Sequence, residues 1–242
     1  MNFNIRALAS AIVLGAITGA AAFYLADFLQ ALAVKRRAGT QITWSDSCGE
    51  IIEPKPTRRP WLYMTIAFVL MASVLVCHGA SIQAAYVFLE LALFLTVAIT
   101  DIKYRLIPNG VVLGILLVHT AWLFAPYLYG VIPALRLNIR NDAMGMLLCF
   151  LAFFGGTVMT GGRVGMGDVK LAMAVGFMLG WQKALLTIAL SGVLMIPFVF
   201  TQPGMNLKVR FKQMIPFGPP FSLAAMLVLT ASFTPLALYM QY

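Results

Sequence analysis

Two aspartates lie where apolar sequence gives way to short polar turns, and their surroundings allow acid–base chemistry. Asp101 stands in TDIKYRLIPN, and Asp168 stands in GGRVGMGDVKLAMAVGFMLGW. Two carboxyl groups held a few Å apart cannot both ionise, so one keeps its proton while the other is charged. The charged carboxylate can take a proton from a water molecule, and the protonated one can polarise a scissile carbonyl. The pair therefore predicts hydrolysis that needs neither a metal ion nor a covalent nucleophile.

The residues next to both aspartates favour an irregular backbone. Gly165 and Gly167 precede Asp168, where they let the chain bend and approach a substrate strand closely. Pro108 marks the start of the helix that follows Asp101, so we expect Asp101 in a short non-helical re-entrant turn. Irregular backbone at membrane depth is tolerated where it lines a protein cavity, which is where an active site would lie.

The alternative interpretation is that the two acids are unrelated carboxylates at the membrane interface, each beside a basic residue. Lys103 and Arg105 follow the first acid, and Lys170 follows the second. For Lys170 a role at the acids and a role as an interfacial anchor are equally compatible with the sequence. Arg105 and Asn109 leave the same two roles open.

The chain that positions these acids has the composition of a membrane protein. Of its 242 residues, 61% are hydrophobic and 10% are charged, whereas soluble domains carry about a quarter charged residues. A helix that crosses a bilayer needs about 20 apolar residues, and the sequence offers eight candidates. These are 7–33, 61–78, 82–100, 108–129, 142–160, 169–181, 184–201 and 218–240. We therefore expect an all-α, polytopic bundle of about eight transmembrane helices that forms one domain over 1–242.

The basic residues predict the orientation of this bundle. The chain carries 17 Lys and Arg against 8 Asp and Glu, a net charge of +9. If the N-terminus faces outward, 13 of the 17 basic residues fall in inside loops and four remain outside, namely Arg6, Arg136, Arg140 and Lys183. Cytoplasmic loops carry such an excess of Lys and Arg. The charge thus indicates a lipid bilayer rather than a nucleic-acid partner, and it puts both aspartates on the cytoplasmic side.

Three motifs occur in a defined order along the chain, TDIKYRLIPN, GMGDVKLAMAVGFMLGW and IPFGPPFSLAA. They resemble the motifs of the prepilin peptidases, the polytopic aspartic proteases of bacterial type IV pilus and type II secretion systems. The resemblance implies cleavage of a short basic leader from prepilin or pseudopilin precursors in the cell inner membrane, with no cofactor. It also implies that Asp101 and Asp168 are the catalytic acids and that a set of neighbours supports them, namely Pro108, Asn109, Gly165, Gly167 and Lys170.

The polar insert 34–60 departs from the pattern of that family. Many bacterial members carry two C-x-x-C pairs there, which form a zinc site, and they also N-methylate the new N-terminus. Here the insert is short and contains Cys48 alone. One thiolate cannot make a four-ligand zinc site. We therefore expect a short cytoplasmic loop and no metal, and N-methylation is left open.

Other polar residues in the apolar segments have structural interpretations. Asp142 begins an expected span, so a charge at a helix N-terminus is its expected role. Glu90 lies about three helical turns before Asp101, and we expect a hydrogen-bonded structural acid between helices. The isolated His119 is expected to be a satisfied interhelical histidine rather than a metal ligand. In IPFGPP, Gly218 and its neighbouring prolines open the last span, where packing is the expected role.

A different class of function remains as the alternative. Acids inside membrane segments can relay protons, which would make the chain a small proton-coupled membrane transporter. An inverted repeat would support that interpretation, and the sequence shows none.

Overall fold

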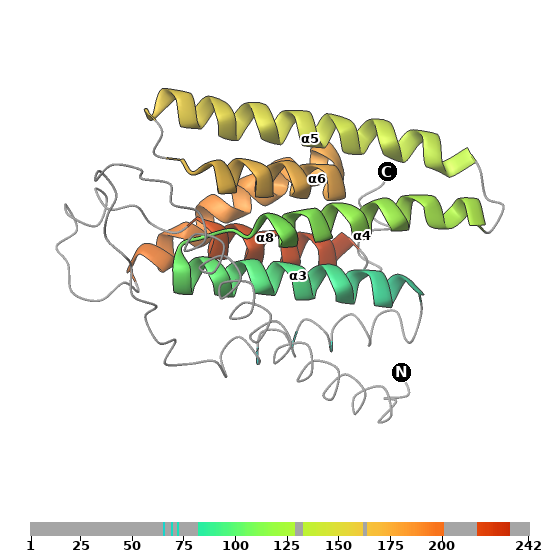
Figure 1. Ribbon diagram of the computed structural model, residues 1–242, viewed down its shortest axis with the longest axis horizontal. Coiled ribbons are helices and arrows are strands. Elements are labelled where there is room, and N and C mark those ends of the chain that lie inside the picture. Colours follow the sequence, from blue (N-terminus) through green and yellow to red (C-terminus); the bar gives the residue numbers. More distant parts are fainter. Residues whose placement is uncertain are drawn as a thin grey trace, which may run out of the picture.

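The described part of the chain is a bundle of helices. The computed structural model describes residues 82–128, 133–161, 164–200 and 217–232, together with Thr65, Val69 and Ala72. Within these residues every regular element is a helix. The helices are α3 (Ile82–Tyr104), α4 (Asn109–Leu128), α5 (Pro133–Met159), α6 (Met166–Phe200) and α8 (Gly218–Ser232), labelled as in Figure 1. The all-α class expected from the sequence is thus confirmed for the described residues.

Three of the described helices are long and apolar enough to cross a membrane. Their apolar stretches are Gln83–Ile102, Ile139–Met159 and Met166–Pro197, and shorter apolar helices cover Asn109–Phe124 and Gly218–Ser232. The first two expected spans, apart from Thr65, Val69 and Ala72, lie outside the described residues, as does the insert 34–60. The count of eight spans therefore stays a prediction.

Two segments that we expected as separate spans lie on either side of a kink within α6. Gly180 has the non-helical angles φ 72° and ψ 170°, and it divides α6 into two helices. These two helices correspond to the expected spans 169–181 and 184–201, and the second is described as far as Phe200. A Cβ atom at Gly180 would collide with the side-chain amide of Asn141 on α5. Glycine adopts a positive φ at little cost, so the chain can reverse direction here and still keep α5 in close contact.

Helices α5 and α6 approach each other closely at a pair of glycines. A Cβ atom on Gly145 would overlap the carbonyl oxygen of Gly176, and one on Gly176 would overlap that of Gly145. Such small residues let helix backbones come together in a membrane, where association depends on van der Waals packing rather than on the exclusion of water. The contact fixes α5 against the first half of α6, which carries Asp168 near its start.

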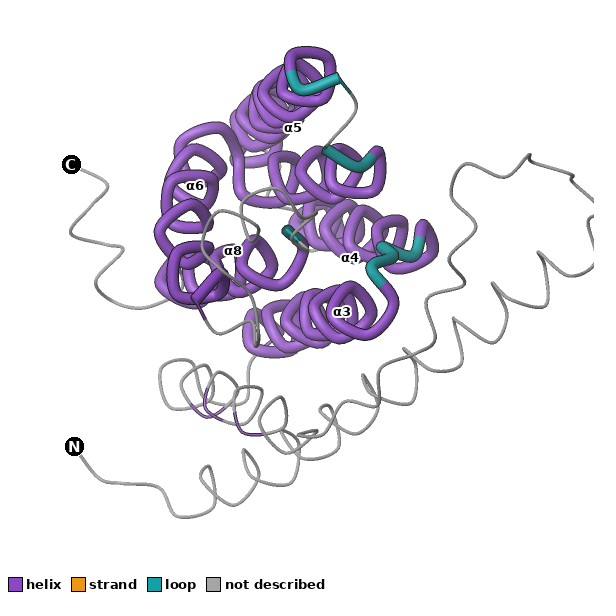
Figure 2. Tube along the Cα trace, turned by 90° about the vertical axis from the view of Figure 1, so that its left-hand side faces the viewer, coloured by secondary structure: helices purple, strands orange, loops and turns teal. Residues whose placement is uncertain are grey.

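The helices run along a common direction, as Figure 1 shows, and Figure 2 shows the bundle along its length. Helix α8 packs against both α3 and α6, and α4 packs against α3, α5 and α6. We call one end of the bundle the aspartate end. There α3 ends at Tyr104, α4 begins at Asn109, α6 begins at Met166 and α8 begins at Gly218.

Candidate active site

Asp101 lies in the last turn of α3, inside the helix. The expectation of a non-helical re-entrant turn at Asp101 was therefore wrong, because the helix continues to Tyr104. Only 5% of the residue is exposed. Its Oδ2 atom accepts a hydrogen bond of 2.9 Å from the backbone N–H of Gly218. A helical residue one turn from the helix end is held more firmly than a residue in a loop, and a second helix fixes its carboxyl group.

The end of α3 depends on Arg105 rather than on the proline that follows. Arg105 has a φ of 49°, and its N–H donates to the carbonyl oxygen of Asp101 at 2.9 Å. A residue in the left-handed conformation commonly ends a helix in this way, although glycine is the usual choice. The Pro108 carbonyl then accepts from Val111 and Val112, at 3.1 Å and 3.3 Å, which starts α4. The non-helical connection is thus only 105–108.

The start of α8 explains why Asp101 receives its hydrogen bond. The first N–H groups of a helix have no partner within the helix. In α8 the second and third residues are Pro219 and Pro220, which have no N–H, and the Phe221 N–H already donates to the carbonyl of Phe217 at 3.2 Å. The remaining donor of that first turn is Gly218, and Asp101 accepts its hydrogen bond. The end of α3 thus supplies the acceptor for the free N–H at the start of α8.

Gly218 also leaves the space that the Asp101 carboxyl occupies. A Cβ atom at Gly218 would lie 2.6 Å from Oδ2 of Asp101 and 2.9 Å from its Cγ. Gly218 thus contacts Asp101 directly, whereas the sequence predicted a packing role for it. The signal that could have identified it is a glycine followed by two prolines at the start of a helix, since that pattern leaves one free N–H and no side chain.

Three phenylalanines hold the start of α8 in place. The rings of Phe217 and Phe221 lie 5.3 Å apart, and Phe153 of α5 contacts them edge-on at 5.3 Å and 5.4 Å. Aromatic pairs of this geometry contribute about 0.5–1.5 kcal/mol beyond the area they bury. The cluster thus ties the backbone donor for Asp101 to α5, which itself packs on the helix of Asp168.

Asp168 is the third residue of α6 and is half-buried. Its N–H donates to the carbonyl of Gly165 at 3.0 Å, and the backbone of Gly165 forms a hydrogen bond to its carboxylate. The third residue of a helix often reaches back in this way to the N–H of the capping residue. Asp168 is therefore held by a backbone amide, as Asp101 is.

The two aspartates come together at the aspartate end. The charge of Asp168 acts on the Asp101 carboxyl, and the charge of Arg105 acts on it as well. The turn that follows Asp101, at 105–108, also contacts the turn at the start of α6, because a Cβ atom on Gly167 would lie 3.3 Å from Cβ of Ile107. All the supporting residues expected from the sequence lie in these turns or in the first residues of α4 and α6.

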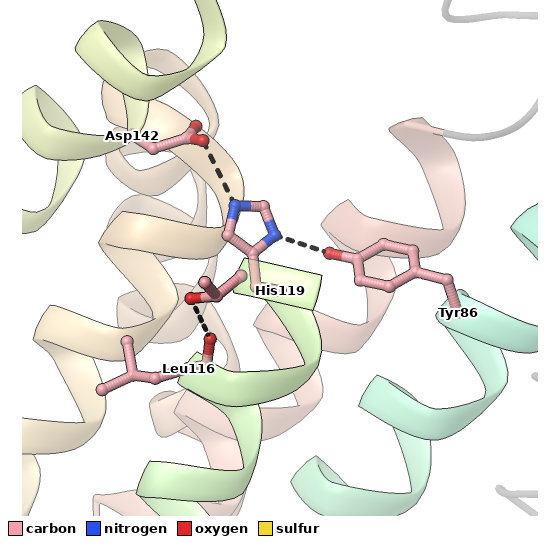
Figure 3. A network of polar contacts seen from close by, with 5 residues as sticks. Tyr86, Leu116, His119 and Asp142 are labelled. Carbon is pink, nitrogen blue, oxygen red and sulfur yellow. Dashed lines mark hydrogen bonds and ion pairs between the residues drawn. The ribbon is translucent and has the colours of Figure 1, made fainter. Parts of the chain in front are cut away.

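His119 and Asp142 form a second polar site away from the two aspartates (Figure 3). The Tyr86 hydroxyl lies 2.9 Å from Nδ1 of His119, and Nε2 of His119 lies 3.2 Å from Oδ2 of Asp142. We call these three buried residues the histidine cluster. Tyr86 precedes Asp101 by 15 residues on α3, which places it about 22 Å away along the helix. The expectation of a satisfied interhelical histidine is thus confirmed.

The other two acids differ from their expected roles. Asp142 is not at a helix N-terminus, because α5 begins at Pro133. Glu90 is fully buried, yet neither of its carboxyl oxygens has a hydrogen-bond partner among the described residues. It lies one helical turn from Tyr86 rather than at the aspartate end.

Apolar helices that bring two aspartates together at one end define the class of the protein as a helical membrane protein with a paired-carboxyl site. The model of the type IV leader peptidase family matches residues 88–200, which include both aspartates. Residues 88–200 of the chain are thus similar to the type IV leader peptidase family. The resemblance drawn from the sequence motifs is thereby confirmed.

A curated relative supports the same family. The prepilin leader peptidase/N-methyltransferase of Bacillus subtilis (strain 168) is 29% identical to this chain over 158 residues. The aligned part covers 65% of this chain and 60% of the relative, so the chain spans about three fifths of the length of the relative that it matches. No solved structure matches the chain.

Proposed function

We propose that this chain is a membrane aspartic endopeptidase that removes the short basic leader of type IV prepilin-like precursors. One observation carries the proposal. Asp101 and Asp168, which come from separate motifs, interact at one end of the bundle inside the region that matches the leader peptidase family. Each carboxyl group is held by a backbone amide, that of Gly218 or that of Gly165.

These backbone hydrogen bonds suit acid–base catalysis. A carboxylate has about four acceptor positions, so one amide donor fixes its orientation and leaves positions free for water. In the proposed reaction one aspartate takes a proton from water as the oxygen attacks the scissile carbonyl. The other aspartate donates its proton to the carbonyl oxygen, which gives a tetrahedral gem-diol. The first aspartate then passes the water-derived proton to the amide nitrogen as the C–N bond breaks, and the second takes back a proton from a diol hydroxyl as the carboxyl product forms. The whole cycle uses side chains of this protein and water.

The proposed substrate fits the proposed orientation of the membrane protein. A precursor with a basic leader in the cytoplasm and an apolar helix in the bilayer places its cleavage junction at a helix end. With the N-terminus outside, the aspartate end faces the cytoplasm at that depth. We propose an inner-membrane, multi-pass peptidase with prepilin or pseudopilin precursors as partners, formed by one domain over 1–242 with the short cytoplasmic loop 34–60. Methyl transfer is not part of the proposal, since the insert contains Cys48 alone.

Conservative substitution of each aspartate tests the proposal. Asp101→Asn and Asp168→Asn should each lower the rate of precursor cleavage by at least about 100-fold, because general acid–base groups contribute about 10²–10⁴-fold. The buried acid Glu90 provides the matched control, and Glu90→Gln should cleave at the wild-type rate per folded molecule. The measurement is the fraction of uncleaved precursor over time in membranes that contain equal amounts of each variant. Cleavage at the wild-type rate by either aspartate variant contradicts the assignment.

Glu90 is the observation that favours the alternative function. A buried acid whose oxygens have no partner among the described residues is a candidate proton carrier. A proton-coupled transporter would show proton flux in liposomes that survives Asp168→Asn and disappears in Glu90→Gln. The peptidase proposal predicts no flux that depends on Glu90.

A further inference from the structure

A hydrogen bond joins the two helices that begin beside the paired aspartates. The Lys170 Nζ atom donates to Oδ1 of Asn109 at 3.2 Å. Asn109 is the first residue of α4, and Lys170 is the fifth residue of α6. The bond therefore joins the first residue of α4, just after the connection that follows Asp101, to the first turns of α6, two residues after Asp168.

The geometry of α6 directs Lys170 away from the neighbouring acid. Residues two apart on a helix are about 200° apart around its axis, and they do not face each other. The side chain of Lys170 thus reaches to α4, while that of Asp168 folds back to Gly165. Both Lys170 and Asn109 are exposed, which places their hydrogen bond at the outer rim of the site.

The second contact between the two turns cannot fix their register by itself. Gly167 lies against the side chain of Ile107, and this contact is apolar. Apolar contacts have no preferred direction, whereas a hydrogen bond constrains both distance and angle. An exposed hydrogen bond also contributes little to stability. Its loss should therefore leave the bundle folded while freeing the start of α6 to move relative to α4.

We propose that Lys170 and Asn109 are a positioning pair that holds the turn of Asp168 in register with Asp101. This inference rests on the proposed peptidase function, because a displacement of about 1 Å at reacting groups can lower a rate by about 100-fold. In this role Lys170 binds Asn109 of α4 and contacts neither the substrate nor the acids. Asn109 accepts the hydrogen bond.

A double-mutant cycle tests the pair. Lys170→Met keeps the length of the side chain without the donor, and Asn109→Ala removes the acceptor. Each should lower kcat for precursor cleavage by about tenfold with KM within about twofold, and the double variant should be no slower than either single variant. Asn109→Asp keeps an acceptor and should recover most of the loss seen in Asn109→Ala. Gln182→Met, an exposed polar-to-apolar change elsewhere on α6, is the matched control and should leave kcat unchanged.

Two kinetic results would overturn the proposal. If the fold-loss in kcat of the double variant equals the product of the two single-variant losses, the two side chains act independently. A rise in KM with kcat unchanged would show that Lys170 binds the substrate directly.

A distance measurement separates this inference from the proposed function. Leu106 and Met166 are exposed, at 39% and 54%, and each lies on one of the two turns. Spin labels at Leu106→Cys and Met166→Cys, in a chain whose three native cysteines are replaced, report the spacing of the turns by pulsed electron paramagnetic resonance. Lys170→Met should broaden a narrow distance distribution, whereas Gln182→Met should not.

The combined outcomes are decisive. Reduced kcat with an unchanged distribution in Lys170→Met contradicts the positioning role. A chain that cleaves no precursor, yet whose distribution broadens in Lys170→Met, overturns the peptidase function and supports the register role of the pair.

Discussion

The aspartate end and the histidine cluster both hold carboxyl groups inside apolar helices, but they hold them with different partners. Asp101 and Asp168 are bound by backbone amides. Asp142 is bound by the side chain of His119, whose other nitrogen is taken by Tyr86. If the Tyr86 hydroxyl donates to Nδ1 and the Nε2–H donates to Asp142, every member of the cluster has a partner.

Under the proposed function, this difference separates a catalytic arrangement from a structural one. Backbone donors orient the two aspartates, whose charges still act on each other. The histidine cluster instead links α3, α4 and α5 in a closed set, and rings pack around it, with Trp122 stacked on Tyr86 at 4.7 Å and Phe177 edge-on to His119 at 5.2 Å. Buried side chains therefore bind one another in the histidine cluster, whereas backbone amides hold the two proposed catalytic acids at the aspartate end.

Removal of His119 should produce the largest change in stability. His119→Leu leaves the buried Asp142 carboxylate without its partner, which should lower the free energy of unfolding by about 3–5 kcal/mol. Replacement of the whole cluster by Tyr86→Phe, His119→Leu and Asp142→Leu should recover most of that loss. Thermal unfolding in detergent measures both, and cleavage per folded molecule should stay at the wild-type level. A large loss of cleavage in folded His119→Leu would contradict the division between the two regions.

Gly218→Ala should act on the other region with an effect on activity. The added methyl group would lie 2.6 Å from Oδ2 of Asp101, so the carboxyl must move, and cleavage should fall by about 100-fold. Gly110→Ala is the matched control, because a Cβ atom there meets nothing within 4 Å. The rate of precursor cleavage compares the two. Equal rates for both variants would show that the contact between Gly218 and Asp101 is not needed.

The smallest effect is expected at Arg105, where stability and activity should change in opposite directions. Its φ of 49° is unfavourable for a residue with a side chain, so Arg105→Gly should raise the free energy of unfolding by about 1 kcal/mol or less. The same change removes the charge that acts on Asp101, and cleavage should slow by a few-fold. Arg105→Lys keeps the charge and separates the two effects. An unchanged cleavage rate in Arg105→Gly would show that Arg105 ends α3 but does not affect cleavage.

The sequence predicted the two aspartates but not the group that holds Asp101. Only eight acids occur in the chain, and carboxylates in apolar segments are costly, so Asp101 and Asp168 were conspicuous. A backbone donor such as the Gly218 N–H cannot be recognised from the sequence, because every residue except proline has an N–H group. Its role became visible only when α8 and α3 were placed side by side.

Helix boundaries were the other feature that sequence patterns described poorly. Pro108 suggested that the helix of Asp101 ends before Asp101. The helix instead ends just before Arg105, which adopts a left-handed conformation with φ 49°. An arginine in the sequence does not predict this conformation. The apolar run at 142–160 suggested a helix that begins at Asp142, whereas polar residues before it continue α5 back to Pro133. That shift moved Asp142 into the helix interior, where His119, 23 residues away, could reach it.

The central claim is that Asp101 and Asp168 together cleave a prepilin-like precursor. The most direct measurement is mass spectrometry of the N-terminus of a precursor produced together with this chain. We predict a shortened N-terminus with the wild-type chain, and the full leader with Asp101→Asn or Asp168→Asn. A full-length precursor with the wild-type chain, or a shortened one with either variant, would contradict the claim.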